Sequence, residues 1–578
     1  LAGAFIASRI RRDAPPSATC MFATTPQHVA DANADELFSV APMMGHTNRH
    51  YRYFWRLLSQ YSTLYTEMIP ASTIVQAYEQ HAKQSLLDTQ RLDSSYLHHP
   101  DCIQQVLQNL QKEKQNPAVA HASTNTCSLD DLLRDDTKHG KITLQLGGRD
   151  PRTLATAAAI ATAYQSVSDC NDHYAYSGIN LNCGCPSTSV ASGRRTGAAL
   201  MLEPQHVVEC LNDMTHAIHD VATNDDNRSL PTLSVKHRLG VQDADRYQRR
   251  KQELLDSGRY SFEQEEEEAY QSCRSFVSHL VLSPSCNHDV SRIQVHGRLA
   301  LLGLSSSSND SLNEHKGEPA KIPSAPSLWM PTAEHLNAAT TPTKVNHQRL
   351  QYRAKQQARQ ATIDNRRIPP LHPNIVPEIA REFSSKANLQ VVTNGGIESI
   401  QNVKQRTVGG VHGAMVGRAA INHPCAFSSV DALFGSKISE PNSNTRRGVL
   451  ERYIQYCVEQ EEEYRQWMQP ADPSKKGSDE GVCTLRRALV APAFHLIVGE
   501  DGNAEYQRLL KKLVGRAQRH CSSQILQAAM AQVPSATLDK DLSDHKPWDT
   551  VHQEFREKHG EAAAGATKRS GAMQRVIH

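Results

Sequence analysis

The sequence lacks any run of eighteen consecutive apolar residues, so it predicts no membrane-spanning helix. Aromatic residues make up only 6% of the 578 residues, and hydrophobic residues make up 39%. We therefore expect the polar excess to collect in loops. Neither sign of charge dominates, because 63 Lys and Arg residues stand against 61 Asp and Glu residues. This balance neither requires nor excludes a nucleic acid partner, and only the local clustering of charge can decide.

The 13 cysteines are scattered without paired spacing. An odd number of such residues favours free thiols in a reducing compartment over a disulfide framework. The first 25 residues contain three arginines and one acidic residue among several Ser, Thr and Ala residues. That composition is typical of an organellar transit peptide, although a disordered extension or a wrongly assigned gene start explains it equally well. We expect a cytoplasmic or organellar protein (plastid or mitochondrion) of a eukaryote, a monomer that uses no metal and no membrane.

Eight short apolar runs, each followed by a polar or glycine-rich turn, alternate with longer helical patterns. This alternation indicates βα units and a parallel sheet, and eight units predict a (β/α)8 TIM barrel. In such a barrel the chemistry lies at the carboxyl ends of the strands. The expected strands are Leu37–Met44, Thr63–Ile69, Ile142–Gly148, Gly178–Gly184, Leu233–Leu239, Arg292–Arg298, Leu389–Gly396 and Gly413–Ala419.

The chain is about twice as long as a minimal barrel, so we expect long loop insertions and a smaller α-helical domain after the barrel. The predicted parts are a tail (1–36), the barrel (37–435), the helical domain (444–530) and a flexible tail (531–578). The insertions are residues 86–140, 241–290 and 305–364. We expect the third to be a disordered loop, because its low-complexity sequence cannot bury enough apolar area. The acidic run Glu263–Glu268 in the second is interpreted as a solvated helix face rather than a partner site.

Helical patterns fill the spaces between the strands and continue to the C-terminal region. They cover Asn48–Gln60, Pro151–Ser166, Pro204–Ala222, Arg446–Gln466, Cys483–Val498 and Ala504–Ala529. The last three have no strand between them, which suggests a separate helical domain. This domain is rich in basic residues: Arg446, Arg447, Arg486, Arg487, Arg508, Lys511, Lys512, Arg516, Arg519 and His520. Such a cationic surface is of little use to an enzyme with a small substrate.

Two glycine turns end the last two expected strands, Asn394-Gly395-Gly396 and Gly417-Arg418. Glycine lets backbone N–H groups approach a phosphate closely, and an arginine can pair with it through two hydrogen bonds. Either turn alone fits an ordinary tight turn. Two of them on consecutive strands, with an arginine, favour a phosphate site.

Lys236 and Gln145 lie on expected strands where a purely structural barrel would have Val or Ile. A buried lysine is costly without an anion or an electron-rich ring. A flavin would supply one, because a cation stabilises the negative charge of its reduced ring while an amide binds the ring edge. His296, near Arg298, is either a structural barrel histidine or a ligand of a phosphate or substrate.

Nine motifs in order resemble the tRNA-dihydrouridine synthases, closest to their A-type branch, the tRNA-dihydrouridine(20/20a) synthases. They are APMMGHTNRHYRYF, LYTEMI, LQLGGRDP, INLNCGCPS, VKHRLG, VHGRLALLGLS, NRRIPPL, TNGGI and GAMVGRAAINHP. The match covers most of residues 37–435 apart from the insertions. The C-terminal region resembles the tRNA-binding domain of that family more weakly.

The resemblance implies an FMN-dependent enzyme that takes electrons from NADPH and reduces the C5=C6 bond of a D-loop uridine in tRNA. A hydride would reach C6 from the flavin, and an acid would protonate C5. Asn182 would bind the target base, and Arg298, Asn365 and Arg366 would contact tRNA or shape the substrate entrance. The implied FMN contacts are Pro42, Met43, Met44, Gln145, Lys236, His296, Asn394, Gly395, Gly396, Gly417 and Arg418.

One loop departs from the pattern that the resemblance implies, which is G-x-x-G-A-C-L with the cysteine as proton donor. Residues 193–200 read GRRTGAAL, with one extra residue and Ala199 in place of the cysteine. Water or another side chain could protonate C5, Cys183 or the rearranged loop could substitute, or the protein could have lost activity while keeping tRNA binding. Cys185 matches the structural Gly-Cys-Pro turn of the family. The persistence of every flavin-binding motif favours retained activity.

Arg194 and Arg195 add two positive charges to the same loop. They would suit the phosphates that flank a flipped base, or they are simply exposed charges. Two rival functions remain: a catalytically impaired tRNA-binding flavoprotein, and another FMN barrel oxidoreductase that acts on a small molecule.

Overall fold

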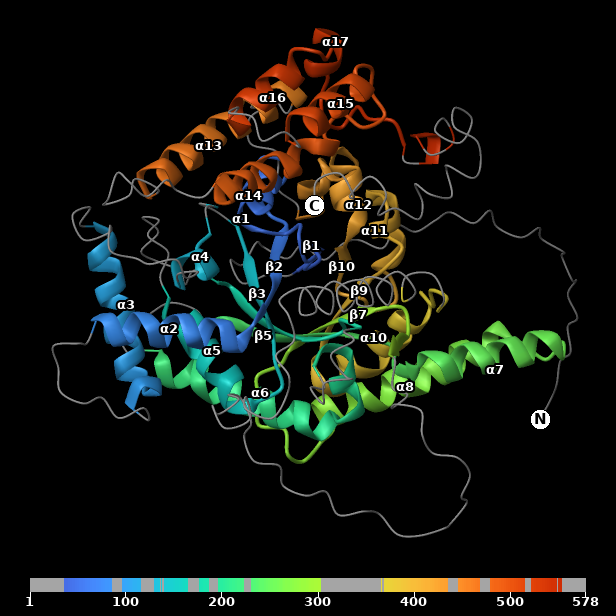
Figure 1. Ribbon diagram of the computed structural model, residues 1–578. Helices are drawn as coiled ribbons and strands as arrows, with labels where there is room; N and C mark the ends of the chain where they lie inside the picture. Colours follow the sequence, from blue (N-terminus) through green and yellow to red (C-terminus); the bar gives the residue numbers. More distant parts are fainter. Residues whose placement is uncertain are drawn as a thin grey trace, which may run out of the picture. The chain divides into compact units, whose positions relative to one another are not determined.

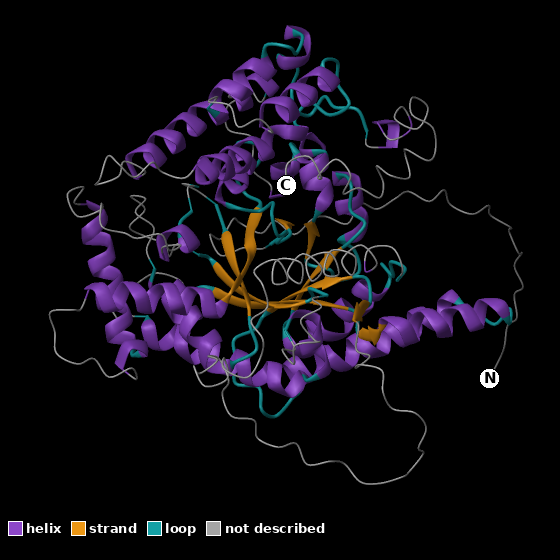
Figure 2. Ribbon diagram, in the orientation of Figure 1, coloured by secondary structure: helices purple, strands orange, loops and turns teal. Residues whose placement is uncertain are grey.

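A closed barrel of eight parallel strands forms the centre of the protein (Figure 2). The structure is a computed structural model that describes residues 36–85, 96–115, 129–135, 137, 140–164, 176–186, 196–222, 230–302, 365, 369–434, 445–467, 479–514, 521–547, 549–551 and 553. The barrel strands are β1 (Phe38–Val40), β2 (Thr63–Pro70), β3 (Ile142–Gly147), β4 (Gly178–Cys183), β5 (Thr232–Arg238), β7 (Arg292–His296), β9 (Gln390–Asn394) and β10 (Gly413–Val416). Each pairs with its neighbours in chain order, and β10 closes the ring on β1. The predicted TIM barrel and its eight strands are confirmed.

Helices cover the outside of the barrel, as the sequence predicted (Figure 1). The α1 helix (Arg49–Arg56) begins at Asn48, whose side chain accepts the backbone N–H of Tyr51. Proline in the first turn starts both α5 (Pro151–Ala163) and α6 (Pro204–Val221), which pack against each other. The remaining helices of the barrel are α2 (Ala71–Ser85), α10 (Ile375–Ala387), α11 (Ile400–Arg406) and α12 (Arg418–Asn422). Proline fits the first turn of α5 and α6 because the first helical N–H has no intrahelical acceptor.

The first two insertions contain helices. Between β2 and β3 lie α3 (Pro100–Gln115), α4 (Leu129–Leu133) and a short 3-10 turn, Tyr96–His98. After β5, the chain adds β6 (Val241–Asp243), which pairs with β8 (Ala300–Leu302) in a small second sheet that the sequence did not predict. Between these strands, α7 (Ala244–Asp256) and α8 (Phe262–Leu282) form a hairpin in which α7 extends away from the barrel (Figure 1). The second half of α8 packs on the barrel, where Phe276 and Leu280 belong to its buried hydrophobic cluster. The third insertion, 305–364, lies outside the described residues.

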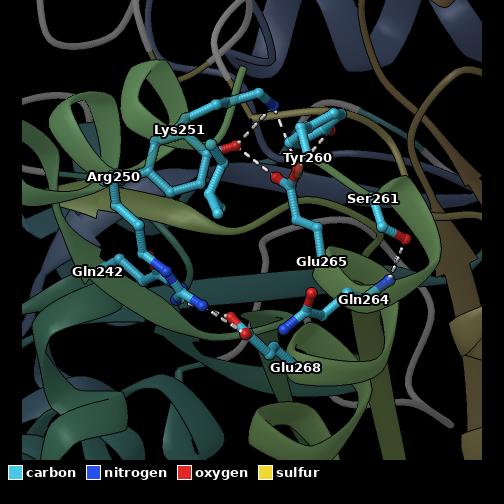
Figure 3. A pocket seen from close by; sticks show the side chains of 10 residues that line it. Gln242, Arg250, Lys251, Tyr260, Ser261, Gln264, Glu265 and Glu268 are labelled. Carbon is cyan, nitrogen blue, oxygen red and sulfur yellow. Dashed lines mark hydrogen bonds and ion pairs between the residues drawn. The ribbon is translucent and has the colours of Figure 1, made fainter. Parts of the chain in front are cut away.

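The acidic run Glu263–Glu268 is only partly a solvated face, contrary to the prediction. Glu265 accepts hydrogen bonds from Tyr260 and Lys251, at 2.6 and 3.1 Å, and Glu268 pairs with Arg250 (Figure 3). These contacts join the two helices of the hairpin and line a small pocket between them. None of the residues that line it belongs to the strand ends of the barrel.

The C-terminal region is helical, with α13 (Arg446–Trp467), α14 (Asp479–Val490), a 3-10 turn (Ala491–His495), α15 (Asn503–Val514), α16 (Ser522–Met530) and α17 (Ser535–Leu538). The expected helix Ala504–Ala529 is therefore two helices. Its hydrophobic core is continuous with that of the barrel, because Tyr453 and Phe427 belong to the same buried cluster as Phe38 and Phe54 of β1 and α1. The division into two domains stays a prediction. Among the described helices, none has both the length and the apolar character that a membrane crossing requires.

Several basic residues of the predicted cationic surface are in ion pairs. Arg446 is fully buried and pairs with Glu500 at 3.0 Å. Arg447 pairs with Asp539 at 2.5 Å, and Arg508 is bound by Glu505. These side chains stabilise the helical region itself, so fewer cations than predicted remain for a nucleic acid.

Candidate active site

The register of the barrel brings the predicted site residues together at the carboxyl ends of the strands, here called the barrel mouth. Asn182 of β4 lies opposite Lys236 of β5. Two residues further along β5, Arg238 lies opposite His296 of β7. His296 in turn lies opposite Asn394 of β9. Residues that are far apart in the sequence therefore become direct neighbours at one end of the barrel.

Positive charge is concentrated around His296. Burial lowers the pKa of this imidazole well below its usual value, and the nearby cations lower it further: Arg238, Lys236, Arg298 and Arg418. The imidazole is therefore neutral and can donate one hydrogen bond and accept another. A cluster of cations of this kind is costly unless an anion compensates it.

Lys236 is half-buried in the mouth, and within the described part of the chain no hydrogen bond or ion pair to its Nζ is seen. Burial lowers the pKa of this lysine to about 8, and the charge of Arg238 contributes to the shift. Burial also lowers the pKa of Arg418, against the attraction of Glu398. An anionic ligand in the mouth would relieve the cost of both charges.

The predicted glycine turn after β9 needs glycine at two positions. Gly395 has a φ of +114° and Gly396 a φ of +67°. An added Cβ at Gly395 would lie 2.9 Å from Cδ2 of His296, and one at Gly396 would lie 2.6 Å from Cδ2 of Leu371. The side chain of Asn394 donates to the backbone oxygen of Met415 at 2.8 Å and thereby holds the ends of β9 and β10 together. This turn keeps its backbone close to His296.

The turn after β1 carries the other predicted cofactor contacts. Met44 is 62% exposed, whereas Pro42 and Met43 are half-buried. The backbone N–H of Met43 donates to Oγ1 of Thr47 at 3.0 Å, which fixes the turn before α1. On the neighbouring strand end, directly after β10, Gly417 leaves open space, because an added Cβ would meet nothing closer than Sδ of Met43 at 3.9 Å. The two predicted contact regions therefore lie side by side at the ends of adjacent strands.

Gln145 is buried, and both the oxygen and the nitrogen of its side-chain amide are already in hydrogen bonds. Its Oε1 accepts from Nδ2 of Asn182 at 2.8 Å, and its Nε2 donates to Oδ1 of Asn180 at 2.7 Å. Each amide group retains further hydrogen-bonding capacity, because the nitrogen carries two hydrogens and the oxygen two lone pairs. Gln145 and Asn182 thus form one rigid unit in the mouth.

Cys185 is a site residue that the sequence interpretation treated as structural only. Oδ1 of Asn182 accepts the backbone N–H groups of Gly184 at 3.0 Å and of Cys185 at 2.9 Å. The thiol is half-buried beside Arg238 and Lys236. Burial raises its pKa, and these two cations only partly oppose the shift, so the thiol keeps its proton. The spacing Asn-x-x-Cys after a strand was the available signal, because an Asn side chain that accepts the N–H groups two and three residues later fixes the following turn.

Cys183, the predicted substitute, is on the other face of β4. It is fully buried in the hydrophobic cluster between the barrel and its helices, near Cys210 of α6. Successive side chains of a strand point to opposite faces, and Asn182 already faces the mouth. This location argues against Cys183 as a proton donor.

Ala199 is fully buried and not open to the mouth, although the N–H of the preceding Ala198 donates to the backbone oxygen of Cys185 at 2.9 Å. It belongs to a 3-10 helix (Gly197–Leu202) and is fully buried in a small cluster with Ala198, Ala300 and Leu302, at the β6–β8 sheet. A thiol in its place would be enclosed by these apolar groups. Having alanine instead of cysteine at position 199 therefore does not deprive the mouth of a proton donor. The loss of the proton donor that the sequence suggested does not follow from the structure.

The predicted tRNA contacts are in different environments. Nη1 of Arg298 donates to the backbone oxygen of Pro369 at 2.5 Å. Asn365 is buried, and its amide exchanges hydrogen bonds of 2.7 Å with both the N–H and the C=O of Leu301. These two hydrogen bonds attach Asn365 to Leu301 of β8. Arg194, Arg195 and Arg366 lie outside the described residues.

Comparisons with known proteins agree with one another. The family model described as dihydrouridine synthase (Dus) matches residues 39–109, 117–258 and 357–474. A protein from Synechocystis named tRNA-dihydrouridine(20/20a) synthase is 27% identical over 431 residues, covering 74% of this chain and 80% of the relative. A protein of the same name from Pseudomonas putida is 27% identical over 434 residues, covering 75% and 81%. Another from Xanthomonas campestris is 36% identical over 217 residues, covering 37% and 43%.

Proposed function

The chain belongs to the dihydrouridine synthase family, a family of oxidoreductases, and from this premise we propose that it is an FMN-dependent tRNA-dihydrouridine synthase. It would use NADPH and reduce the C5=C6 bond of a uridine in the D-loop of tRNA, at position 20 or 20a. Positions 20 and 20a are the ones given in the names of the relatives from Synechocystis and Pseudomonas putida. The observation that carries the proposal is the association of a protonated thiol, Cys185, with a base-binding amide, Asn182, and a lysine without a partner in the described structure, Lys236.

The residues of the mouth fit FMN. Its phosphate would be held by Arg418 and the neutral imidazole of His296, next to the backbone of Gly395, Gly396 and Gly417. Lys236 would face the ring, where a cation stabilises the negative charge of the reduced form. Pro42, Met43 and Met44 would cover it from the β1 side, Gln145 would bind its edge, and Asn394 would hold the glycine turn. When bound, FMN supplies the hydride for C6 of the uracil.

The protein's own part in the reaction is to orient the base and to provide a proton. The target uridine has to leave its stack, which a folded loop permits at modest cost. An amide such as that of Asn182 can bind the edge of the flipped base. Sγ of Cys185 gives its proton to C5, and the raised pKa of the thiol ensures that a proton is available at neutral pH. This assignment replaces the water, Cys183 and loss-of-activity accounts that the sequence left open.

The test is stopped-flow oxidation of the NADPH-reduced protein by unmodified tRNA, followed by mass spectrometry of the tRNA. We expect tRNA to accelerate reoxidation of the flavin and one D-loop uridine to gain 2 Da. A flavin that NADPH reduces but tRNA does not reoxidise would identify a non-catalytic tRNA-binding flavoprotein. Reoxidation by a small molecule but not by tRNA would favour another FMN barrel oxidoreductase.

A further inference from the structure

A row of hydrogen-bonded side chains, here called the amide chain, crosses the barrel interior from the mouth to the amino ends of the strands. Asn182 donates to Gln145 at 2.8 Å, and Gln145 donates to Asn180 at 2.7 Å. Asn180 donates to Oε1 of Gln294 at 2.9 Å. Nε2 of Gln294 then donates to the hydroxyl of Tyr65 at 2.8 Å and to Oε2 of Glu36 at 3.3 Å. All six side chains are buried: Glu36, Tyr65, Gln145, Asn180, Asn182 and Gln294.

Every hydrogen bond of the amide chain runs in the same direction, towards Glu36. An ionised carboxylate can only accept, so Gln294 presents its NH2 group to Glu36 and its carbonyl to Asn180. The orientation of Gln294 in turn determines the orientation of the Asn180 amide, then of Gln145 and then of Asn182. Each amide must present its oxygen to the donor before it.

The last amide of the chain faces the turn that carries the thiol. Because Nδ2 of Asn182 is directed at Gln145, its Oδ1 is left for the N–H groups of Gly184 and Cys185. If the Asn182 amide were reversed, two backbone donors would face an NH2 group and the turn would lose both bonds. The orientation of one amide therefore determines whether the turn is held.

Glu36 is well fixed at its end of the barrel. Its side chain accepts from the hydroxyl of Tyr65 at 2.9 and 3.0 Å, and Nη1 of Arg292 lies 3.4 Å from Oε2. Burial and the charge of Glu36 raise the pKa of Tyr65 well above its usual value, so the phenol stays a donor. An added Cβ at Gly413 would lie 1.9 Å from the backbone oxygen of Glu36, so the close approach depends on glycine. The sequence assigned Glu36 to the tail, but it is part of the barrel interior.

We propose that Glu36 is a positioning residue: its carboxylate orients the amide chain and thereby holds the turn of Cys185 at the far end of the barrel. The orienting effect depends only on the hydrogen bonds described, whereas its consequence for catalysis rests on the proposed function. Hydrogen bonds in such a chain also polarise one another, which strengthens the preference for one direction.

The experiment compares backbone hydrogen exchange in three full-length variants by mass spectrometry of a peptide that covers 178–186. Glu36→Gln keeps the shape but removes the obligatory acceptor, and we expect exchange of the Gly184 and Cys185 amides to rise about tenfold, as loss of a hydrogen bond predicts. The swap Glu36→Gln with Gln294→Glu moves the carboxylate one step along the chain. Because the relocated carboxylate would still accept from Asn180, we expect protection as in the unchanged protein.

The matched control is Glu382→Gln. Glu382 also accepts from a tyrosine, Tyr270 at 3.1 Å, and from an arginine, Arg274 at 2.8 Å, but it lies on α10 outside the barrel. Exchange at 184–185 should not change in this variant. Unchanged exchange in Glu36→Gln, or a swap that folds but is not protected, would overturn the proposal. If Glu36→Gln does not fold, the swap alone decides.

Activity provides a second readout. In Glu36→Gln we expect a lower kcat with an unchanged KM for tRNA, because the thiol is displaced while the tRNA surface is intact. A protein that shows the exchange effect but never reduces tRNA would refute the proposed function and leave the orienting role of Glu36 in place.

Discussion

Oδ1 of Asn182 accepts the backbone N–H of Cys185 at 2.9 Å, so the residue expected to bind the uracil also holds the turn that bears the thiol. The distance between the amide of Asn182 and the turn of Cys185 is thus fixed by this hydrogen bond. Lys236 lies beside Asn182 on the next strand, which places the cation, the amide and the thiol in one part of the barrel mouth. This arrangement leads to predictions that separate the binding of cofactor and base from the transfer of the proton.

Cys185→Ala should reduce the rate of tRNA reduction by about 10²- to 10⁴-fold, the usual loss when a general acid is removed. Reduction of the flavin by NADPH should be unaffected, because it needs no thiol. The single-turnover rates of the two half-reactions measure this directly. Cys183→Ala is the control and should turn over normally, since its side chain faces the helices. Equal losses in both variants would contradict the assignment.

The affinity of the apoprotein for FMN should fall as pH rises through about 8, the pKa to which burial lowers Lys236. The protonated lysine attracts the anion and the neutral one does not, so binding weakens on the alkaline side. Fluorescence titrations between pH 7 and 9.5 would show the trend. Lys236→Gln should bind more weakly at pH 7 and lose this pH dependence. A dependence that survives in the variant would assign it to another group.

Gly396→Ala should lower both stability and FMN affinity. Its φ of +67° costs an L-residue about 1 kcal/mol, and the new methyl group would lie 2.6 Å from Leu371. Gly410→Ala is a matched control, because Gly410 has a φ of +87° but no atom closer than 3.7 Å to an added Cβ, near α10. Thermal unfolding should show a loss in both variants, whereas FMN titration should show a loss only for Gly396→Ala.

Acid should destabilise the protein through His237. Burial lowers the pKa of this imidazole to about 4, against about 6.5 in the unfolded chain. Between these pH values the unfolded state binds more protons, so the free energy of unfolding falls as pH falls from 6.5 to 4. The loss should be on the order of 3 kcal/mol. Urea unfolding measured across this range should give a flatter pH profile for His237→Leu than for the unchanged protein.

Arg195→Ala should weaken tRNA binding and reduce the slope of log K against log salt concentration by about 1, as expected for the loss of one phosphate contact. Filter binding at several salt concentrations gives the slope. Arg259, exposed on the turn between α7 and α8, provides the control, and Arg259→Ala should leave the slope unchanged. An unaltered slope in Arg195→Ala would refute the contact.

Local sequence patterns determined the eight strands, the proline-started helices and the glycine turn of Gly395 and Gly396, because each depends on neighbours along the chain. The same patterns could have placed Cys183 outside the barrel, since it directly follows the inward Asn182 on a strand. Only the tertiary structure showed that Ala199 packs on the small β6–β8 sheet, that the C-terminal helices share the core of the barrel, and that Glu36 ends the amide chain. These features depend on contacts between residues far apart in the sequence, and such contacts produce no periodic pattern of residues along the chain. The sequence therefore determined which chemical groups are present, and the fold decided which of them face one another.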